Sequence, residues 1–128
     1  MANKKIKILL IEDDSFLLNM YATKFEIENF NVVVAEDGEK GLEAALTEDP
    51  DIILLDIMLP KMDGFDVLKQ IKNDQTTTNI PVILLTNLSQ KDDIDKGLAM
   101  GAIDFLIKAH FMPSEVVEKI KKILKNKN

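Results

Sequence analysis

Five short apolar runs recur along the chain and alternate with longer amphipathic segments. The runs are rich in β-branched residues and are bounded by Asp, Asn, Pro or Gly. They cover residues 6–11, 32–35, 52–55, 82–85 and 103–107. Their apolar character is nearly continuous rather than alternating, which is typical of parallel strands that are covered on both faces.

Helical spacing of apolar residues fills the intervals between these runs. Ser15 is expected to cap a first helix, and Pro113 is expected to open the last. Three further helices are predicted over residues 39–47, 65–73 and 90–100, the third closing at Gly101. The polar stretch 73–79 is expected to be a surface loop. Strict alternation of strands and helices predicts an α/β fold, with a doubly wound five-stranded parallel sheet and helices on both faces.

Length and composition narrow the function classes. The 128 residues fit one domain, 1–128, with a core over about residues 5–125 and no visible output domain. The net charge is −6 and every base is lysine, which disfavours direct nucleic-acid binding. There is no cysteine, and the N-terminal apolar run 8–11 is too short for a signal peptide or a membrane span. A soluble cytoplasmic domain with no membrane contact is therefore expected.

Acidic residues follow two of the predicted strands. Glu12 and Asp13 come after the first strand, and Asp56 comes after the third. At about 4 Å and an effective dielectric near 20, each pair of these charges would repel by roughly 4 kcal/mol. A single acid here could simply cap a helix or favour a turn. For the three together, a shared Mg²⁺ is the better explanation, because this ion prefers oxygen ligands.

A shared ion also constrains the order of the strands. Neighbouring strands lie about 4.8 Å apart, so the first and third strands must be adjacent. The order 2-1-3-4-5 meets this condition, whereas an order beginning 3-2-1 would separate them by roughly 9.6 Å. Thr86 then ends the neighbouring fourth strand. Lys108 lies two strands away from Asp56, but its long stem can bring the ammonium back.

Together these groups suit phosphoryl transfer onto an aspartate. Asp56 would attack in line, Lys108 and the cation would neutralise the equatorial oxygens, and Thr86 would donate a hydrogen bond to one of them. Such a transfer depends mostly on positioning and on charge neutralisation.

Five short motifs carry a resemblance to a known family. In chain order they are Ile11-Glu12-Asp13-Asp14, Leu55-Asp56-Ile57-Met58-Leu59-Pro60, Met62-Asp63-Gly64, Leu85-Thr86 and Phe105-Leu106-Ile107-Lys108. Each motif alone is weak, but together they mark the ends of successive strands. The sequence resembles the response-regulator receiver domains of two-component signalling over essentially the whole chain. The resemblance implies a flavodoxin-like fold.

The resemblance also implies roles for single residues. Asp56 would be the phosphoacceptor, and Asp13 and the Met58 backbone carbonyl would be ligands of Mg²⁺. Glu12 would act on the metal through water, while Thr86 and Lys108 would contact the phosphoryl group. Phe105 falls where the family has an aromatic switch residue, although an ordinary core aromatic would fit the position equally.

The partners that follow are those of a phosphorylation-activated switch. A histidine kinase or phosphotransfer protein would supply the phosphoryl group to Asp56, as in a phosphorelay. Binding to an output domain, a partner protein or a second copy would then change through the face formed by the fourth helix, fifth strand and fifth helix. The domain would catalyse only its own phosphorylation and its own dephosphorylation. The dephosphorylation is expected to be slow, because Met58 and Leu88 offer no polar group to hold the attacking water.

Alternatives remain open at this stage. The family usually has proline after its lysine, but Ala109 stands there, and a cis bond before alanine is unfavourable by about 2.5–4 kcal/mol. Asn87 replaces a residue that is commonly small, and His110 is expected to be an exposed loop histidine. A pseudo-receiver that binds partners without phosphorylation is the main alternative. A phosphatase of the haloacid-dehalogenase type is disfavoured because Met58 occupies the place of its second acid.

Overall fold

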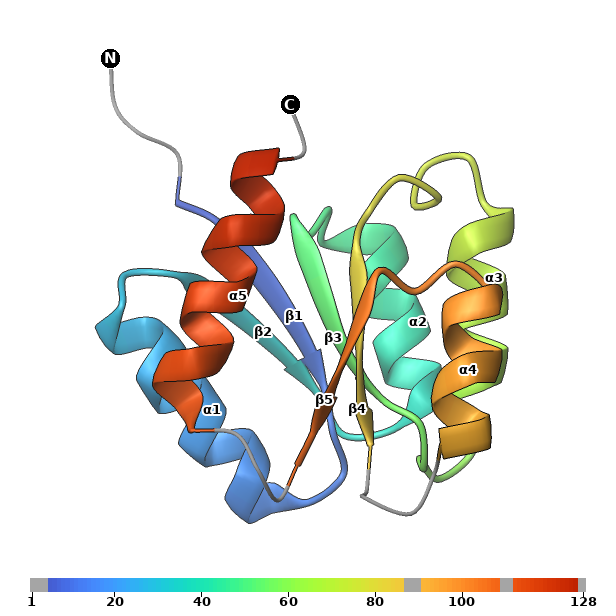
Figure 1. Cartoon of the computed structure of the whole chain (residues 1–128), viewed down its shortest axis with the longest axis horizontal. Helices are drawn as coiled ribbons and strands as arrows, with labels where there is room; N and C mark the ends of the chain where they lie inside the picture. Colours follow the sequence, from blue (N-terminus) through green and yellow to red (C-terminus); the bar gives the residue numbers. More distant parts are fainter. Residues whose placement is uncertain (1–4, 87–90, 109–111, 127–128) are drawn as a thin grey trace.

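The predicted alternation of strands and helices is confirmed by the computed structural model, which describes residues 5–86, 91–108 and 112–126 (Figure 1). The predictions made for Asn87, Leu88, Ala109 and His110 lie outside these residues. The strands are β1 (Lys7–Ile11), β2 (Asn31–Ala35), β3 (Ile52–Asp56), β4 (Val82–Thr86) and β5 (Asp104–Ile107). The helices are α1 (Ser15–Ile27), α2 (Gly38–Thr47), α3 (Gly64–Asn73), α4 (Lys91–Ala99) and α5 (Pro113–Asn126).

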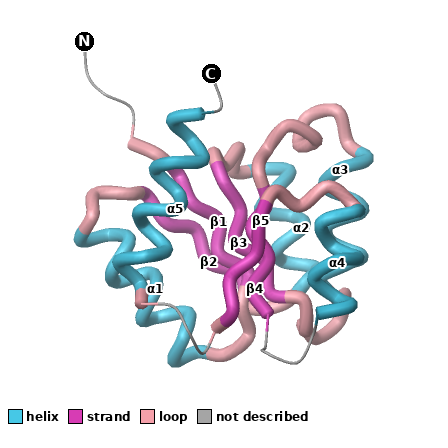
Figure 2. Tube along the Cα trace, viewed as in Figure 1, coloured by secondary structure: helices cyan, strands magenta, loops and turns pink. Residues whose placement is uncertain are grey.

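The strands form one parallel sheet in the order β2-β1-β3-β4-β5, which confirms the predicted order. Helices α1 and α5 cover one face of the sheet, and α2, α3 and α4 cover the other (Figures 1 and 2). In β1 and β3, Ile11 is in register with Leu55, so the residues that follow these two strands emerge side by side.

Alternate residues of each strand enter two separate apolar cores. Leu10 and Leu54 face α1 and α5, whereas Leu9 and Ile53 face the other helices, and all four are fully buried. Because side chains in a strand alternate between faces, a sheet covered on both sides requires an apolar residue at every position. This is why the apolar runs in the sequence are continuous.

Aspartates, not serine, begin the helices that follow the first three strands. The prediction that Ser15 caps α1 is wrong, because Asp14 is the capping residue and Ser15 is the first residue of the helix. Asp14 Oδ1 accepts hydrogen bonds from the amides of Phe16, at 2.9 Å, and Leu17, at 3.2 Å. Asp37 and Asp63 cap α2 and α3 in the same way. Several acids at this end of the sheet therefore have a structural role.

The segment after α3 is a surface loop, as expected, but one of its residues is buried and anchors it. Thr77 is buried, and its hydroxyl donates a hydrogen bond to the carbonyl of Ile71 at 2.7 Å. Lys72 Nζ donates to the carbonyls of Thr78 and Ile80, at 3.0 and 2.8 Å. These bonds tie the segment to the last turn of α3, so it forms an ordered entry into β4.

Gly101 closes the α4 region as predicted. Its φ of +114° lies in the range that favours glycine, and the amide of Ala102 donates back to the carbonyl of Gly97 at 3.1 Å. Among the described residues, no helix combines the length and the apolar character that crossing a bilayer would need.

Candidate functional site

Three carboxylates meet at the carboxyl ends of β1 and β3, along the lower edge of the sheet in Figure 1. Asp56 is the last residue of β3 and Glu12 directly follows β1, and both are buried. Asp13 is exposed beside them. Each residue offers an oxygen, and these oxygens lie within 4.8 Å of one another. Opposite ligands of an octahedral Mg²⁺ are about 4.2 Å apart, so a small adjustment would let the three residues share this ion.

Lys108 reaches this cluster from the end of β5. Its Nζ lies 2.6 Å from Asp56 Oδ2 and 2.9 Å from Glu12 Oε1. The Lys108 amide donates to the carbonyl of Thr86 at 2.9 Å, which anchors the backbone where β5 ends. The ammonium therefore spans the intervening strand β4 and provides the positive charge between two buried acids.

Burial and charge act against each other in this group. Burial raises the pKa of Glu12, the Asp14 amide opposes this shift, and the charge of Asp56 adds to it. Burial alone would lower the pKa of Lys108. Its hydrogen bonds and ion pairs with Asp56 and Glu12 outweigh that effect, so the Lys108 pKa is raised overall. Lys108 is consequently held as a cation.

The cleft above the carboxylates has a volume of about 690 Å³ and a mixed lining. Its floor is acidic, whereas Phe16 and Met58 on its rim are 74% and 60% exposed. The Met58 amide donates to Asp56 Oδ1 at 3.1 Å, and this bond fixes the carboxylate on the floor of the cleft. Asp56 is thus held from two sides, with an open approach over apolar side chains.

Thr86 and Phe105 occupy the two strands beside this cluster. Thr86 ends β4, one strand from Asp56, and it is 1% exposed. Phe105 is half-buried in β5 and packs against the core under α2 and α3. The structure therefore brings Glu12, Asp13, Asp56 and Lys108 into one cluster, places Met58 on its rim and puts Thr86 on the adjacent strand.

Two residues that contact or surround this cluster were not identified from the sequence. The Asp14 amide donates to Glu12 Oε2 at 3.0 Å, so the residue that caps α1 also orients a site carboxylate. Tyr21 lies on the apolar side of α1, yet the charges of Glu12 and Lys108 both act on the pKa of its hydroxyl. Helical periodicity marks a buried position but does not show where a long side chain ends.

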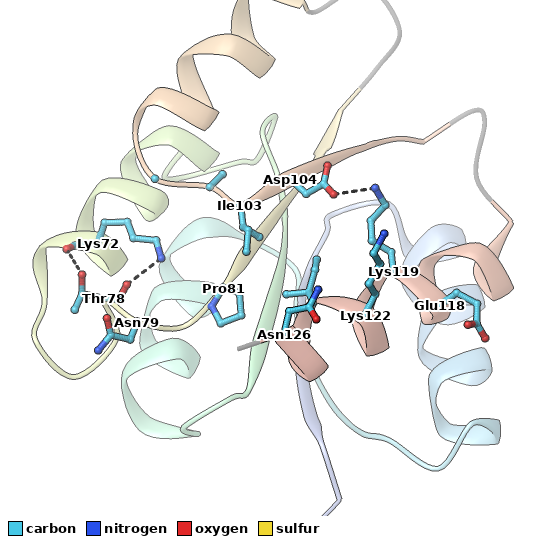
Figure 3. A pocket seen from close by; sticks show the side chains of 13 residues that line it. Lys72, Thr78, Asn79, Pro81, Ile103, Asp104, Glu118, Lys119, Lys122 and Asn126 are labelled. Carbon is cyan, nitrogen blue, oxygen red and sulfur yellow. Dashed lines mark hydrogen bonds and ion pairs between the residues drawn. The ribbon is translucent and has the colours of Figure 1, made fainter. Parts of the chain in front are cut away.

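A larger hollow of about 1030 Å³ lies at the opposite end of the sheet, beside the amino ends of β4 and β5 (Figure 3). Lys119 in this hollow is paired with Asp104 at 2.8 Å, and Lys72 is bonded to backbone carbonyls. These charged side chains therefore hold the fold together. The acidic cluster lies at the carboxyl ends of the strands, where ligands bind in open α/β sheets.

Comparison with known proteins shows which family the chain belongs to. The family model of the response regulator receiver domain matches residues 8–121. The chain belongs to this family. Receiver domains are signalling proteins of two-component systems and are not classical enzymes.

The receiver domain is 39% identical over 119 residues to the alkaline phosphatase synthesis transcriptional regulatory protein PhoP of Bacillus subtilis. The match covers 93% of this chain and 48% of PhoP. The chain spans about half the length of the first curated relatives that it matches.

Solved receiver domains have the same fold. A CheY-like receiver domain protein of Methanospirillum hungatei superimposes with a TM-score of 0.89 at 26% identity, over 97% of each chain. The receiver domain of the sensor histidine kinase PA1611 from Pseudomonas aeruginosa gives a TM-score of 0.82 at 26% identity. That match covers 96% of this chain and 97% of the other, which has a magnesium ion coordinated in its active site cleft.

Proposed function

We propose that this receiver domain is a switch that accepts a phosphoryl group on Asp56. The observation that carries the proposal is the contact of one half-buried lysine, Lys108, with two buried carboxylates at 2.6 and 2.9 Å. Such an arrangement is costly to fold, because each charge must be taken out of water. It serves a purpose if the lysine and the acids act on a shared anionic ligand.

Mg²⁺ would be held by Asp13, Asp56 and the backbone carbonyl of Met58, with Glu12 acting on it through water. The clustered oxygens and the exposed position of Asp13 support this assignment. When bound, the ion supplies positive charge that offsets the negative charge of the phosphoryl oxygens.

In the transfer, an Asp56 oxygen attacks the phosphorus in line with the bond to the donor. The new O–P bond forms as the N–P bond of a phosphohistidine breaks, and the electron pair of that bond stays on the imidazole nitrogen. Lys108 then turns its ammonium toward a phosphoryl oxygen, and the Thr86 hydroxyl donates a hydrogen bond to another.

The donor would be a histidine kinase or phosphotransfer protein in the cytoplasm. The output would be a change in binding at the face formed by α4, β5 and α5, where a partner protein, an output domain or a second copy would dock. On this face Lys119 of α5 pairs with Asp104 of β5 at 2.8 Å, and at its border Lys96 of α4 lies 4.3 Å from the centre of the Phe65 ring of α3. These contacts are available for exchange when the face rearranges.

The test is intact-mass spectrometry after incubation with phosphoramidate and Mg²⁺. The wild type should gain one hydroxylamine-sensitive phosphoryl group, and Asp56→Asn should gain none. Asp66→Asn, which removes an exposed acid of α3, should be modified as the wild type is. Equal modification of Asp56→Asn would refute the assignment of Asp56. Complete absence of modification in the wild type would favour the pseudo-receiver alternative.

A further inference from the structure

Tyr21 carries a buried hydroxyl without a hydrogen-bond partner. Its side chain is 1% exposed within α1, and no described residue accepts or donates a hydrogen bond at its Oη. The ring stacks on Phe25 with centroids 5.9 Å apart, so an apolar phenylalanine ring could make the same contact. Buried polar groups are nearly always paired, and an unpaired one calls for a physical reason.

Glu12 Oε1 is the second such atom among the described residues. It lies 2.9 Å from Lys108 Nζ, an ion-pair contact whose angle does not give it a hydrogen bond. The other oxygen, Oε2, is held by the Asp14 amide at 3.0 Å. One side of the carboxylate is therefore fixed, and the other side depends on Lys108.

The two atoms without a hydrogen bond belong to one region of the molecule. Side chains of a helix point back toward its amino end, and the amino end of α1 lies beside the acidic cluster. Tyr21 accordingly extends from the second turn of α1 toward Glu12. Burial raises the pKa of its hydroxyl, the charge of Glu12 raises it further, and the charge of Lys108 lowers it. Both site groups thus act on this hydroxyl.

We propose that Tyr21 is a positioning residue whose hydroxyl donates to Glu12 Oε1 across one buried water and holds this carboxylate when Lys108 turns to the phosphoryl group. A hydroxyl is a donor and the carboxylate is an acceptor, so the two atoms satisfy each other. The role of Tyr21 in the site rests on the proposed function. The contact between hydroxyl and carboxylate does not depend on phosphorylation and can be tested without it.

The first experiment uses tyrosine fluorescence without metal. Tyr21 is the single tyrosine of the chain and there is no tryptophan, so all of this emission comes from Tyr21. A carboxylate that accepts the phenol proton quenches the emission. Glu12→Gln should therefore brighten it, whereas Glu26→Gln, which removes an exposed acid of α1, should leave it unchanged. Equal emission from the wild type and Glu12→Gln would overturn the proposal.

The second experiment measures Mg²⁺ affinity by titration calorimetry. Tyr21→Phe keeps the ring and removes only the hydroxyl, so it should weaken Mg²⁺ binding roughly three- to tenfold, as expected for the loss of one hydrogen bond. Phe25→Leu is the matched control, because it loosens the stacked pair and keeps the hydroxyl. It should lower the melting temperature without changing the Mg²⁺ affinity.

Unchanged Mg²⁺ affinity in Tyr21→Phe would overturn the positioning role, and so would an equal loss of affinity in Phe25→Leu. If Glu12→Gln brightens Tyr21 but the wild type neither binds Mg²⁺ nor accepts a phosphoryl group, the proposed function fails while the contact between Tyr21 and Glu12 stands. The two failures are thus distinguishable.

Discussion

Met58 lies at the rim of the cleft through which water would approach Asp56. It lines the cleft, is 60% exposed and carries no group that can orient a water molecule. Met58→Asn should therefore hasten loss of the phosphoryl group by roughly three- to tenfold, which is the change in rate expected from one contact that positions the water. The decay can be followed by intact-mass spectrometry after removal of the donor.

The matched control for this prediction is Met112→Asn. Met112 is similarly exposed, at 63%, but does not line the cleft. Its decay should equal that of the wild type. If Met58→Asn also decays at the wild-type rate, the explanation of a long-lived phosphorylated state by water access is wrong.

At the scale of single residues, the sequence indicates which acids gather but not how each is held. The sequence predicts that Glu12, Asp13 and Asp56 lie together, because the carboxyl ends of parallel strands meet at one edge of the sheet. The choice between Asp14 and Ser15 as the cap of α1 could not be made, since both side chains can accept a hydrogen bond from the first amides of the helix. The approach of Tyr21 to Glu12 depends on three-dimensional packing that periodicity does not encode.

Among the elements, α3 is the helix whose position is most tightly coupled to Asp56. Gly64 begins this helix, and a Cβ there would lie 2.4 Å from the backbone oxygen of Asp56 and 2.6 Å from Ile57 Cα. Backbone atoms of a central strand cannot move aside. Gly64→Ala should thus lower the free energy of unfolding by roughly 1–3 kcal/mol and slow the phosphorylation of Asp56.

Gly97→Ala is the comparison for this prediction. A Cβ at Gly97 would meet the Leu84 side chain, whose end can rotate, while alanine gains about 1 kcal/mol of helix propensity in the interior of α4. Gly97→Ala should therefore be less destabilising by chemical denaturation and should leave phosphorylation close to normal. Equal losses in both variants would contradict the coupling of α3 to Asp56.

The sequence predicts the elements well where one physical signal dominates. Continuous apolar runs gave all five strands, because both faces of the sheet are covered. The segment after α3 was predicted correctly as a surface loop, but the burial of one of its threonines was not predicted. The structure shows that one polar side chain, Thr77, can be buried when its hydroxyl reaches a free carbonyl at a helix end. A count of polar residues does not reveal such a partner.

For the molecule as a whole, negative charge is concentrated at one edge of a chain that already carries a net charge of −6. Mg²⁺ should therefore stabilise the fold by mass action. At a concentration ten times the dissociation constant the gain is about 1.4 kcal/mol, or roughly 5 °C in melting temperature. Thermal scans with MgCl₂ and with NaCl of equal ionic strength separate binding from screening.

Asp13→Asn should weaken this response while slightly stabilising the metal-free protein. Asp13 is exposed, so the relief of repulsion should stay below about 1 kcal/mol. Asp66→Asn should leave the Mg²⁺ response intact. A wild type whose melting temperature is the same in both salts would contradict a shared ion.

The strand order could be predicted because two requirements agree: the acids that follow β1 and β3 must share one ion, and neighbouring strands have a fixed spacing. The distance of Lys108 Nζ from Asp56 could not be predicted, since a flexible four-carbon stem allows many end points. In the structure, the attraction of the two buried acids selects one of these end points for the Lys108 ammonium.

The contact of Lys108 with Asp56 joins residues that are 52 positions apart in the chain. While the protein is being synthesised, Asp56 leaves the ribosome well before Lys108, and β3 cannot acquire its counter-charge until β5 has added to the edge of the sheet. A half-made or misfolded chain thus carries the aspartate without the ammonium that would neutralise an arriving phosphoryl group. On the proposed function, the switch would become competent only when β5 is in place.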